Sequence, residues 1–396
     1  MNSLALLTQN VTTTINMKKK NFKTITSLML AGALVFSSIG NAIACTALIV
    51  TDVNGNAYHG RTLEFSFPVP TLMTYFPAGT KIESVTPAGV QGVTFNTKYA
   101  ILGMTAAVTT GAKQPLIDEG ANDQGLSFSG NELNDLTAPP LGDDASKILS
   151  LNDFGAWVLG NFKTVAEVKT ALLTDNTEFW LPPIPMMGGA PLPLHYAIFD
   201  KAGNGLVVEF INGKKNVYDN PVGVMTNAPE FPWHLTNLNN YTFTNVNKNT
   251  GQLGKQKLQT ADAGIALTAL PSAQTATGRF VKAAFYTNYV RKGKNPEDAI
   301  NLLAHIMNNF DRPQDLTIDP PGGVGDGPRG SKFSSEVTEW TTMNDLARNL
   351  TFVKSINALN WTVIDMNKLK DVQQVKSVST YAVDQAGADA FNLFYK

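Results

Sequence analysis

The residue that could carry chemistry is Cys45, the single cysteine of the 396-residue chain. It directly follows Ala42-Ile43-Ala44, and such a small-x-small sequence is typical of a secretory cleavage site. Cleavage there would place a thiol and an α-amine on one residue. Because the usual pKa of a thiol is about 8.5 and that of an α-amine about 7.7–8.0, the amine can take the thiol's proton near neutral pH. The pattern predicts a nucleophile that carries its own base.

Arg61 and Glu64 are the charged partners predicted for this thiol and amine. A nearby arginine favours the thiolate, and a carboxylate can orient the amine. Two strands, Cys45–Val53 and Asn56–Leu63, are expected around the Asn54-Gly55 turn signal. A two-residue loop would set the cysteine opposite Glu64 and turn Arg61 to the other face, unless the strand bends. The alternative interpretation of an arginine and a glutamate three residues apart is a solvated surface pair.

A secretory leader is expected over residues 1–44. Lysines at 18, 19, 20 and 23 precede an apolar stretch, Thr26–Ile39, that is short for a membrane span. Translation from Met1 or from Met17 fits equally. Residues 45–396 are then a single domain in the periplasm or outside the cell. Removing four lysines changes the net charge from −1 to about −5, and a mildly acidic chain without a basic block argues against nucleic acid as a partner.

A second hypothesis makes Cys45 a lipid anchor. Small residues before a cysteine also resemble a lipobox, although Ala42 stands where leucine is commoner. The protein would then be an envelope binding or structural module, and an acylated cysteine could be neither nucleophile nor free amine. After removal of a signal peptide, no later apolar run approaches the roughly 20 residues of a membrane helix. The two hypotheses exclude each other.

Periodicity predicts runs of strands with helices in clusters between them, which is an α+β class with mainly antiparallel sheets. Further strands are expected at Val93–Tyr99, Ala106–Thr109, Leu126–Ser129, His195–Phe199, Leu206–Ile211, Val337–Asn344, Leu350–Ile356 and Trp361–Ile364. Helices are expected within Leu151–Leu173, Thr260–Leu270, Gly278–Tyr289 and Asn295–Phe310.

The four histidines, His59, His195, His234 and His305, are interpreted as structural, because no sequence typical of a Cys-His protease surrounds the cysteine. No cluster of histidine, cysteine or acidic residues has metal-ligand spacing, and no glycine-rich phosphate loop follows a strand. We therefore expect neither a metal nor a cofactor.

Several motifs lie in order along the chain: Cys45-Thr46 with Gly60–Glu64, Asp118–Leu126, Val224–Pro229 with Trp233–Leu238, and Gly278–Ala284. Together they resemble the choloylglycine hydrolase family, which includes bile salt hydrolases and penicillin V acylases. The resemblance implies a four-layer αββα sandwich of the N-terminal nucleophile type, commonly a tetramer, which cleaves linear amides.

The resemblance also implies a role for individual residues. Cys45 would be the nucleophile, with Arg61 beside the thiol, and Asn227 would donate to the tetrahedral oxyanion. Arg279 would complete the polar network. The second oxyanion position, an Asn or Tyr in the family, falls near Asn131-Glu132, and Asn131 is taken for this role.

This chain departs from the family's pattern at one site residue, and the resemblance leaves a choice among three substrates. Glu64 stands where the family usually has aspartate. The resemblance implies a small amide substrate: penicillin V, an N-acyl homoserine lactone or a conjugated bile salt. Four apolar residues after the predicted hairpin could line an acyl pocket or simply pack in the core: Phe65, Phe67, Met73 and Phe76.

Overall fold

The structure is a computed structural model, and it describes residues 44–65, 69–106, 110–134, 136–185, 189–242, 250–260, 264–314, 316, 336–387 and 391–395. The predicted leader lies outside the described residues except for Ala44. The same holds for position 67 of the proposed acyl pocket and for most of the strand predicted at 106–109.

Two antiparallel sheets form the centre of the fold. The first has six strands, in the order β14 (Val224–Met225), β1 (Ala44–Thr51), β2 (Ala57–Phe65), β17 (Val337–Asp345), β18 (Leu350–Ser355) and β19 (Thr362–Asp365). The second has eight strands, in the order β13 (Lys214–Asp219), β12 (Gly205–Ile211), β11 (Leu194–Asp200), β8 (Leu126–Glu132), β7 (Leu116–Asn122), β6 (Ile101–Ala106), β3 (Thr71–Phe76) and β20 (Lys376–Ser379).

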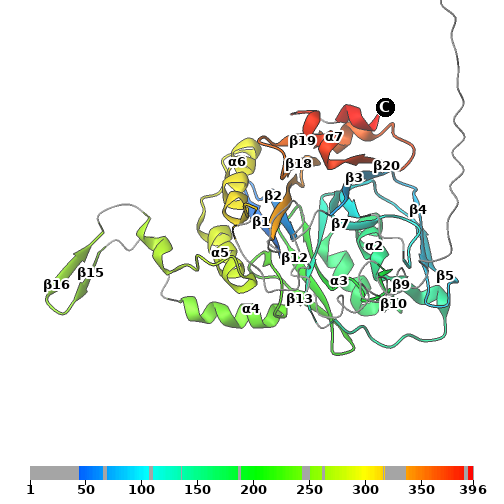
Figure 1. The fold of residues 1–396 in the computed structure, drawn as a ribbon, viewed down its shortest axis with the longest axis horizontal. Helices are drawn as coiled ribbons and strands as arrows, with labels where there is room; N and C mark the ends of the chain where they lie inside the picture. The colour runs from blue at the N-terminus through cyan, green and yellow to red at the C-terminus, as the bar shows by residue number, and fades with distance from the viewer. Residues whose placement is uncertain are drawn as a thin grey trace, which may run out of the picture. The chain divides into compact units, whose positions relative to one another are not determined.

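Helices cover the outer faces of both sheets, as Figure 1 shows. On the six-stranded sheet, α5 (Ala276–Tyr289) packs against β1 and α6 (Pro296–Met307) against β2 and β17. On the eight-stranded sheet, α2 (Phe154–Asn161) packs against β7 and β8, and α3 (Val165–Thr174) against β11 and β12. Because β1 also contacts β8, the inner faces of the sheets meet and the order of layers is αββα. The predicted fold class is confirmed.

Smaller elements complete the described residues. Three strand pairs lie outside the two sheets: β4 (Lys81–Val85) with β5 (Gln91–Asn96), β9 (Ile148–Ser150) with β10 (Glu178–Trp180), and β15 (Thr250–Leu253) with β16 (Gln256–Gln259). The β9–β10 pair is parallel. Two further α-helices are α4 (Phe231–Asn237) and α7 (Thr380–Gln385). The 3₁₀ turns are η2 (Ala145–Lys147), η3 (Leu151–Asp153), η5 (Leu238–Tyr241), η6 (Ile265–Ala269), η7 (Asn308–Phe310), η9 (Met366–Leu369) and η10 (Phe391–Phe394).

Capping residues explain where two of the predicted helices begin. The Thr164 hydroxyl accepts the N–H of Glu167 ahead of α3, and the Asn295 side chain caps α6 just before Pro296. The helix expected over residues 260–270 is wrong, because the described part of this segment forms only η6. Gly264, with φ at +88°, interrupts the chain in the left-handed region before that turn.

No helix among the described residues is long and apolar enough to cross a membrane.

Candidate active site

Strand β1 ends at Thr51 and β2 begins at Ala57, but Asp52 and Asn56 continue the pairing, so the hairpin loop holds three residues, Val53–Gly55. The two-residue loop predicted from Asn54-Gly55 is wrong. The Asp52 N–H donates to the Asn56 carbonyl at 3.0 Å, and Gly55 has φ at +84°. The Asp52 carboxylate accepts the backbone N–H groups of Asn54 and Asn56 at 2.8 and 2.9 Å. An aspartate that bonds its own backbone two residues on favours a wider turn ending in a left-handed glycine.

The added loop residue inverts the faces expected for the charged partners. Cys45 lies opposite Leu63, and Glu64 lies opposite Ala44. Because a shift of one residue moves every side chain to the other face of a strand, Arg61 shares the face of the thiol without any bend. Glu64 points away from the thiol, towards the helix-covered side of the sheet. The expected placement of both residues is therefore corrected.

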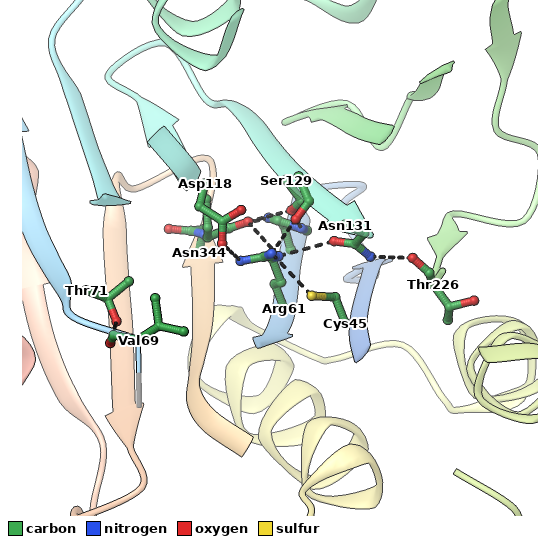
Figure 2. Close-up of polar contacts among 12 residues, drawn as sticks. Cys45, Arg61, Val69, Thr71, Asp118, Ser129, Asn131, Thr226 and Asn344 are labelled. Carbon is green, nitrogen blue, oxygen red and sulfur yellow. Dashed lines mark hydrogen bonds and ion pairs between the residues drawn. The ribbon is translucent and has the colours of Figure 1, made fainter. Parts of the chain in front are cut away.

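Arg61 holds the thiol through a fully buried guanidinium (Figure 2). One of its terminal nitrogens lies 3.5 Å from Cys45 Sγ and also donates to the Gly130 carbonyl. The other terminal nitrogen donates to Asp118 Oδ2 at 2.9 Å, and Nε donates to Asn131 Oδ1 at 3.3 Å. All the nitrogens are thus engaged, which fixes the plane of the guanidinium against the sulfur.

Burial dominates the electrostatics of the thiol. The Cys45 side chain is fully buried, and this raises its pKa to about 12, although the positive charge of Arg61 acts in the opposite direction. The negative charges of Glu64 and Asp118 add to the increase. In the chain that still carries Ala44, the thiol is therefore protonated near neutral pH.

Asn227 and Arg279 meet the backbone of the cysteine. Asn227 Oδ1 accepts the Cys45 backbone N–H at 2.8 Å and a terminal N–H of Arg279 at 2.6 Å. Asn227 Nδ2 donates to the Glu132 carbonyl at 3.1 Å. Arg279 also donates to the Cys45 carbonyl and, at 2.8 Å, to the Thr46 hydroxyl. These bonds connect α5 and the segment after β14 to Cys45 and Thr46 at the start of β1.

Asn131 bridges Arg61 and the segment that carries Asn227. Its Oδ1 accepts from Arg61, and its Nδ2 donates to the Thr226 carbonyl at 2.8 Å and to the Met225 carbonyl at 3.3 Å. The structure thus joins five of the predicted site residues in one hydrogen-bonded network: Cys45, Arg61, Asn131, Asn227 and Arg279.

Glu64 lies outside that network, although it is fully buried. Its Oε1 accepts from the Thr338 hydroxyl at 3.3 Å. Burial raises the pKa of the Glu64 carboxyl, and the charges of Arg279 and Arg312 oppose the shift. Its place beside these two arginines makes Glu64 a counter-charge for Arg279 from behind the strand.

Sequence reasoning missed the acidic residues that hold Arg61 from β7. Asp118 is the arginine's direct partner, and its side chain is 13 % exposed. Behind it, Glu119 accepts from the Ser129 hydroxyl at 2.5 Å and lies 4.0 Å from Arg61 Nε. Burial raises the pKa of Glu119 to about 8. They lie in the eight-stranded sheet, whereas Cys45 lies in the six-stranded one, so no local spacing signal connects them; only the motif around 118–126 pointed to this segment.

Among the described residues, no group of three or more histidine, cysteine or acidic side chains is arranged to hold a metal ion.

The fold is that of the N-terminal nucleophile hydrolases. A conjugated bile acid hydrolase variant from Clostridium perfringens superimposes with a TM-score of 0.70 and 28% identity, over 85% of this chain and 97% of the other. The penicillin V acylase of Agrobacterium tumefaciens gives a TM-score of 0.67, with 24% identity over 86% and 93% of the two chains.

The sequence comparisons narrow this class to one family. The model of linear amide C–N hydrolases of the choloylglycine hydrolase family matches residues 45–377. A bile salt hydrolase/transferase of Clostridium perfringens is 31% identical over 82% of this chain and 93% of its own length. A penicillin V acylase of Pectobacterium atrosepticum is 26% identical over 88% and 89%. The chain belongs to the choloylglycine hydrolase family, and it is a linear amide hydrolase.

Proposed function

We propose that Cys45, made N-terminal by removal of residues 1–44, is the nucleophile in the hydrolysis of an amide between an apolar acyl group and a polar amine. The observation that carries the proposal is the pair of contacts made by this one residue. Its backbone nitrogen lies 2.8 Å from Asn227 Oδ1, while its sulfur lies 3.5 Å from Arg61. The nitrogen that cleavage would turn into an amine therefore already has an acceptor beside it.

The reaction then needs no group beyond the chain and water. The thiol gives its proton to the α-amine, and the sulfur attacks the carbonyl carbon of the substrate. The tetrahedral intermediate collapses, the C–N bond breaks, and the proton passes from the α-ammonium to the leaving nitrogen. A thioester remains on Cys45. Water, deprotonated by the α-amine, attacks this thioester and releases the acid together with the free thiol.

Asn227 is the proposed oxyanion donor. Its side-chain amide carries two N–H groups, and one of them donates to the Glu132 carbonyl at 3.1 Å. The second is available for the negative oxygen of the intermediate, a contribution of about 2.7–4 kcal/mol. Asn131 directs its amide at two backbone carbonyls, so we assign it to holding Arg61 and the Asn227 segment in place. Arg279 has the same kind of role, through the Cys45 carbonyl.

Removal of the leader would activate the site. While Ala44 is attached, the Cys45 nitrogen belongs to a peptide bond and has no basic lone pair. The thiol is fully buried with its pKa raised to about 12. Cleavage supplies the base and removes Ala44, the first residue of β1. An uncleaved chain is therefore expected to be inactive.

An apolar cluster next to the thiol supports an apolar acyl group. Leu63, Phe65, Met73 and Trp340 are buried in the same cluster as Cys45, whereas Phe76 belongs to a different one. Apolar walls with a few polar anchors are the usual form of a small-molecule site. The candidate substrates are penicillin V, a long-chain N-acyl homoserine lactone and a conjugated bile salt. Comparing kcat/KM on penicillin V, such a lactone and glycocholate selects among them.

Cys45→Ser provides the decisive test. We expect this variant to keep the native circular dichroism spectrum and to lose most amide hydrolysis, since a serine hydroxyl is a far weaker nucleophile under the same base. Mass spectrometry of the active wild-type protein should find Cys45 as the free N-terminus. An active protein that retains its leader would refute the mechanism.

Export to the periplasm or the medium also remains our proposal and follows from the same cleavage. An N-terminal mass increased by acyl chains would instead favour the lipid-anchored alternative, for which the comparisons provide no support.

A further inference from the structure

The segment that carries the proposed oxyanion residue is held by three side chains through its carbonyl groups. Asn131 Nδ2 donates to the Thr226 carbonyl at 2.8 Å, and His195 Nε2 lies 3.1 Å from the same oxygen. His234 Nε2 lies 2.8 Å from the Asn227 carbonyl. The orientation of the Asn227 amide thus depends on groups that themselves touch neither the thiol nor the proposed oxyanion.

His195 stands out because both of its ring nitrogens face acceptors. Nδ1 lies 3.0 Å from Glu209 Oε1, and Nε2 faces the Thr226 carbonyl, which can only accept. The same Glu209 oxygen also accepts the Phe231 backbone N–H at 2.8 Å. A neutral imidazole has a single N–H and can satisfy only one of these acceptors, whereas an imidazolium satisfies both. Because the Thr226 carbonyl can only accept, Nε2 carries the proton that joins the two groups, and Glu209 fixes the buried ring through Nδ1.

Several elements of the fold surround this pair. His195 projects from β11 directly opposite Asn131 of β8, and Glu209 projects from β12. His234 of α4 is the other titratable group nearby; burial lowers its pKa to about 4, and the charge of His195 adds to the decrease. Arg279 of α5 also acts on His234. His234 is thus neutral, and its one N–H lies at Nε2, against the Asn227 carbonyl.

We propose that His195, held by Glu209, is a positioning residue for the oxyanion site: it donates to the Thr226 carbonyl and thereby fixes the amide of Asn227. The inference rests on the proposed function, because it assigns Asn227 the role of oxyanion donor. Neither His195 nor Glu209 contacts Cys45. A loosened Asn227 should therefore lower kcat and leave substrate binding largely intact.

Two substitutions at one position separate this role from simple packing. In His195→Gln, the amide nitrogen occupies the place of Nε2 and still donates to Thr226. In His195→Asn, the amide nitrogen occupies the place of Nδ1 and reaches only Glu209. We expect His195→Asn to lower kcat about 10- to 100-fold with KM changed by less than about threefold, the range for a small misplacement of a catalytic group. His195→Gln should retain most of kcat. Because this variant leaves the buried Glu209 side chain without its histidine partner, His195→Gln with Glu209→Gln serves as the version protected against unfolding.

The result that overturns the proposal is equal kcat in the asparagine and glutamine variants, or an asparagine variant as active as the wild type. Asp200→Asn, at the far end of β11, is the control for general damage to that strand. Nitrogen-15 spectra of histidine-labelled wild-type protein supply a readout that does not require hydrolysis. We expect Nε2 of His195 to carry a proton, with its signal assigned by its loss in His195→Asn. An Nε2 without a proton would refute the positioning role even if the proposed amide hydrolysis were confirmed, and a protonated Nε2 would support the hydrogen bond to Thr226 even if that hydrolysis were not found.

Discussion

Replacing Asn227 by alanine tests the centre of the proposed site. In the structure this side chain makes three hydrogen bonds, to the Cys45 nitrogen, to Arg279 and to the Glu132 carbonyl. The variant loses all three as well as the proposed donor to the oxyanion. We therefore expect two separate effects, one on the free energy of unfolding and one on kcat.

The size of each effect follows from the kind of bond removed. Two of the three bonds are between neutral groups and one is to a guanidinium, so their loss should lower the free energy of unfolding by about 2.5–6 kcal/mol. Loss of one oxyanion donor should lower kcat by about 10²- to 10³-fold. Unfolding in urea, followed by tryptophan fluorescence, measures the first effect. Release of the amine product under saturating substrate measures the second.

Asn220→Ala is the matched control. Asn220 is also a buried asparagine of the same segment, and its side chain bonds the backbone of Gly223 and Val224 at 2.9 to 3.3 Å. It contacts neither Cys45 nor Arg279. Its removal should lower the free energy of unfolding by about 1.5–4.5 kcal/mol and leave kcat nearly unchanged. If both alanine variants lose kcat to the same degree, Asn227 is a structural residue and the assignment of the oxyanion donor is refuted.

Two further substitutions test the electrostatics. Arg61→Lys should slow alkylation of Cys45 by iodoacetamide in the processed enzyme, because a single ammonium cannot replace a guanidinium that contacts the sulfur and its neighbours together. Arg348→Lys, away from the site, is the control and should leave this rate unchanged. Equal rates in the wild type and both variants would count against the role of Arg61. Burial raises the pKa of Asp153 from 3.8 to about 7, so the folded chain holds a proton that the unfolded chain releases. The free energy of unfolding, relative to Asp153→Asn, should therefore fall as pH rises from about 4 to about 7, and a pH-independent difference in urea unfolding would contradict the shift.

Local patterns predicted much of the fold. The hairpin at Asn54-Gly55, the capped helices after Thr164 and Asn295, and the antiparallel class all depend on neighbours in sequence, and the structure confirms them. The helix expected over residues 260–270 was a wrong prediction, because a glycine in the left-handed region interrupts helical backbone there. Propensity within a short window gives the type of an element better than its ends, because tertiary contacts decide where regular structure stops.

The site was predictable only where a motif carried it. Asn227 and Arg279 were found by resemblance, since nothing in their local sequence brings them to Cys45. Asp118 and His195 were missed for the same reason: both lie in the eight-stranded sheet, and they reach the site through the packing of the two sheets, not through neighbours in sequence. A buried histidine between two acceptors cannot be recognised from composition. Only the coordinates show that its Nε2 faces a carbonyl and its Nδ1 a carboxyl oxygen.

One loop residue decides which charge meets the nucleophile. With a two-residue turn, Glu64 would share the face of the thiol and raise its pKa further by like charge; with the three-residue turn, Arg61 occupies that face and opposes the increase. The Asp52 carboxylate stabilises the longer loop by accepting from the backbone of Asn54 and Asn56. The turn residues are therefore part of the site's chemistry although they lie at the far end of the hairpin. The departure from aspartate at position 64 is tolerable for the same reason, because that side chain faces Arg279 behind the strand and its extra methylene does not meet the thiol.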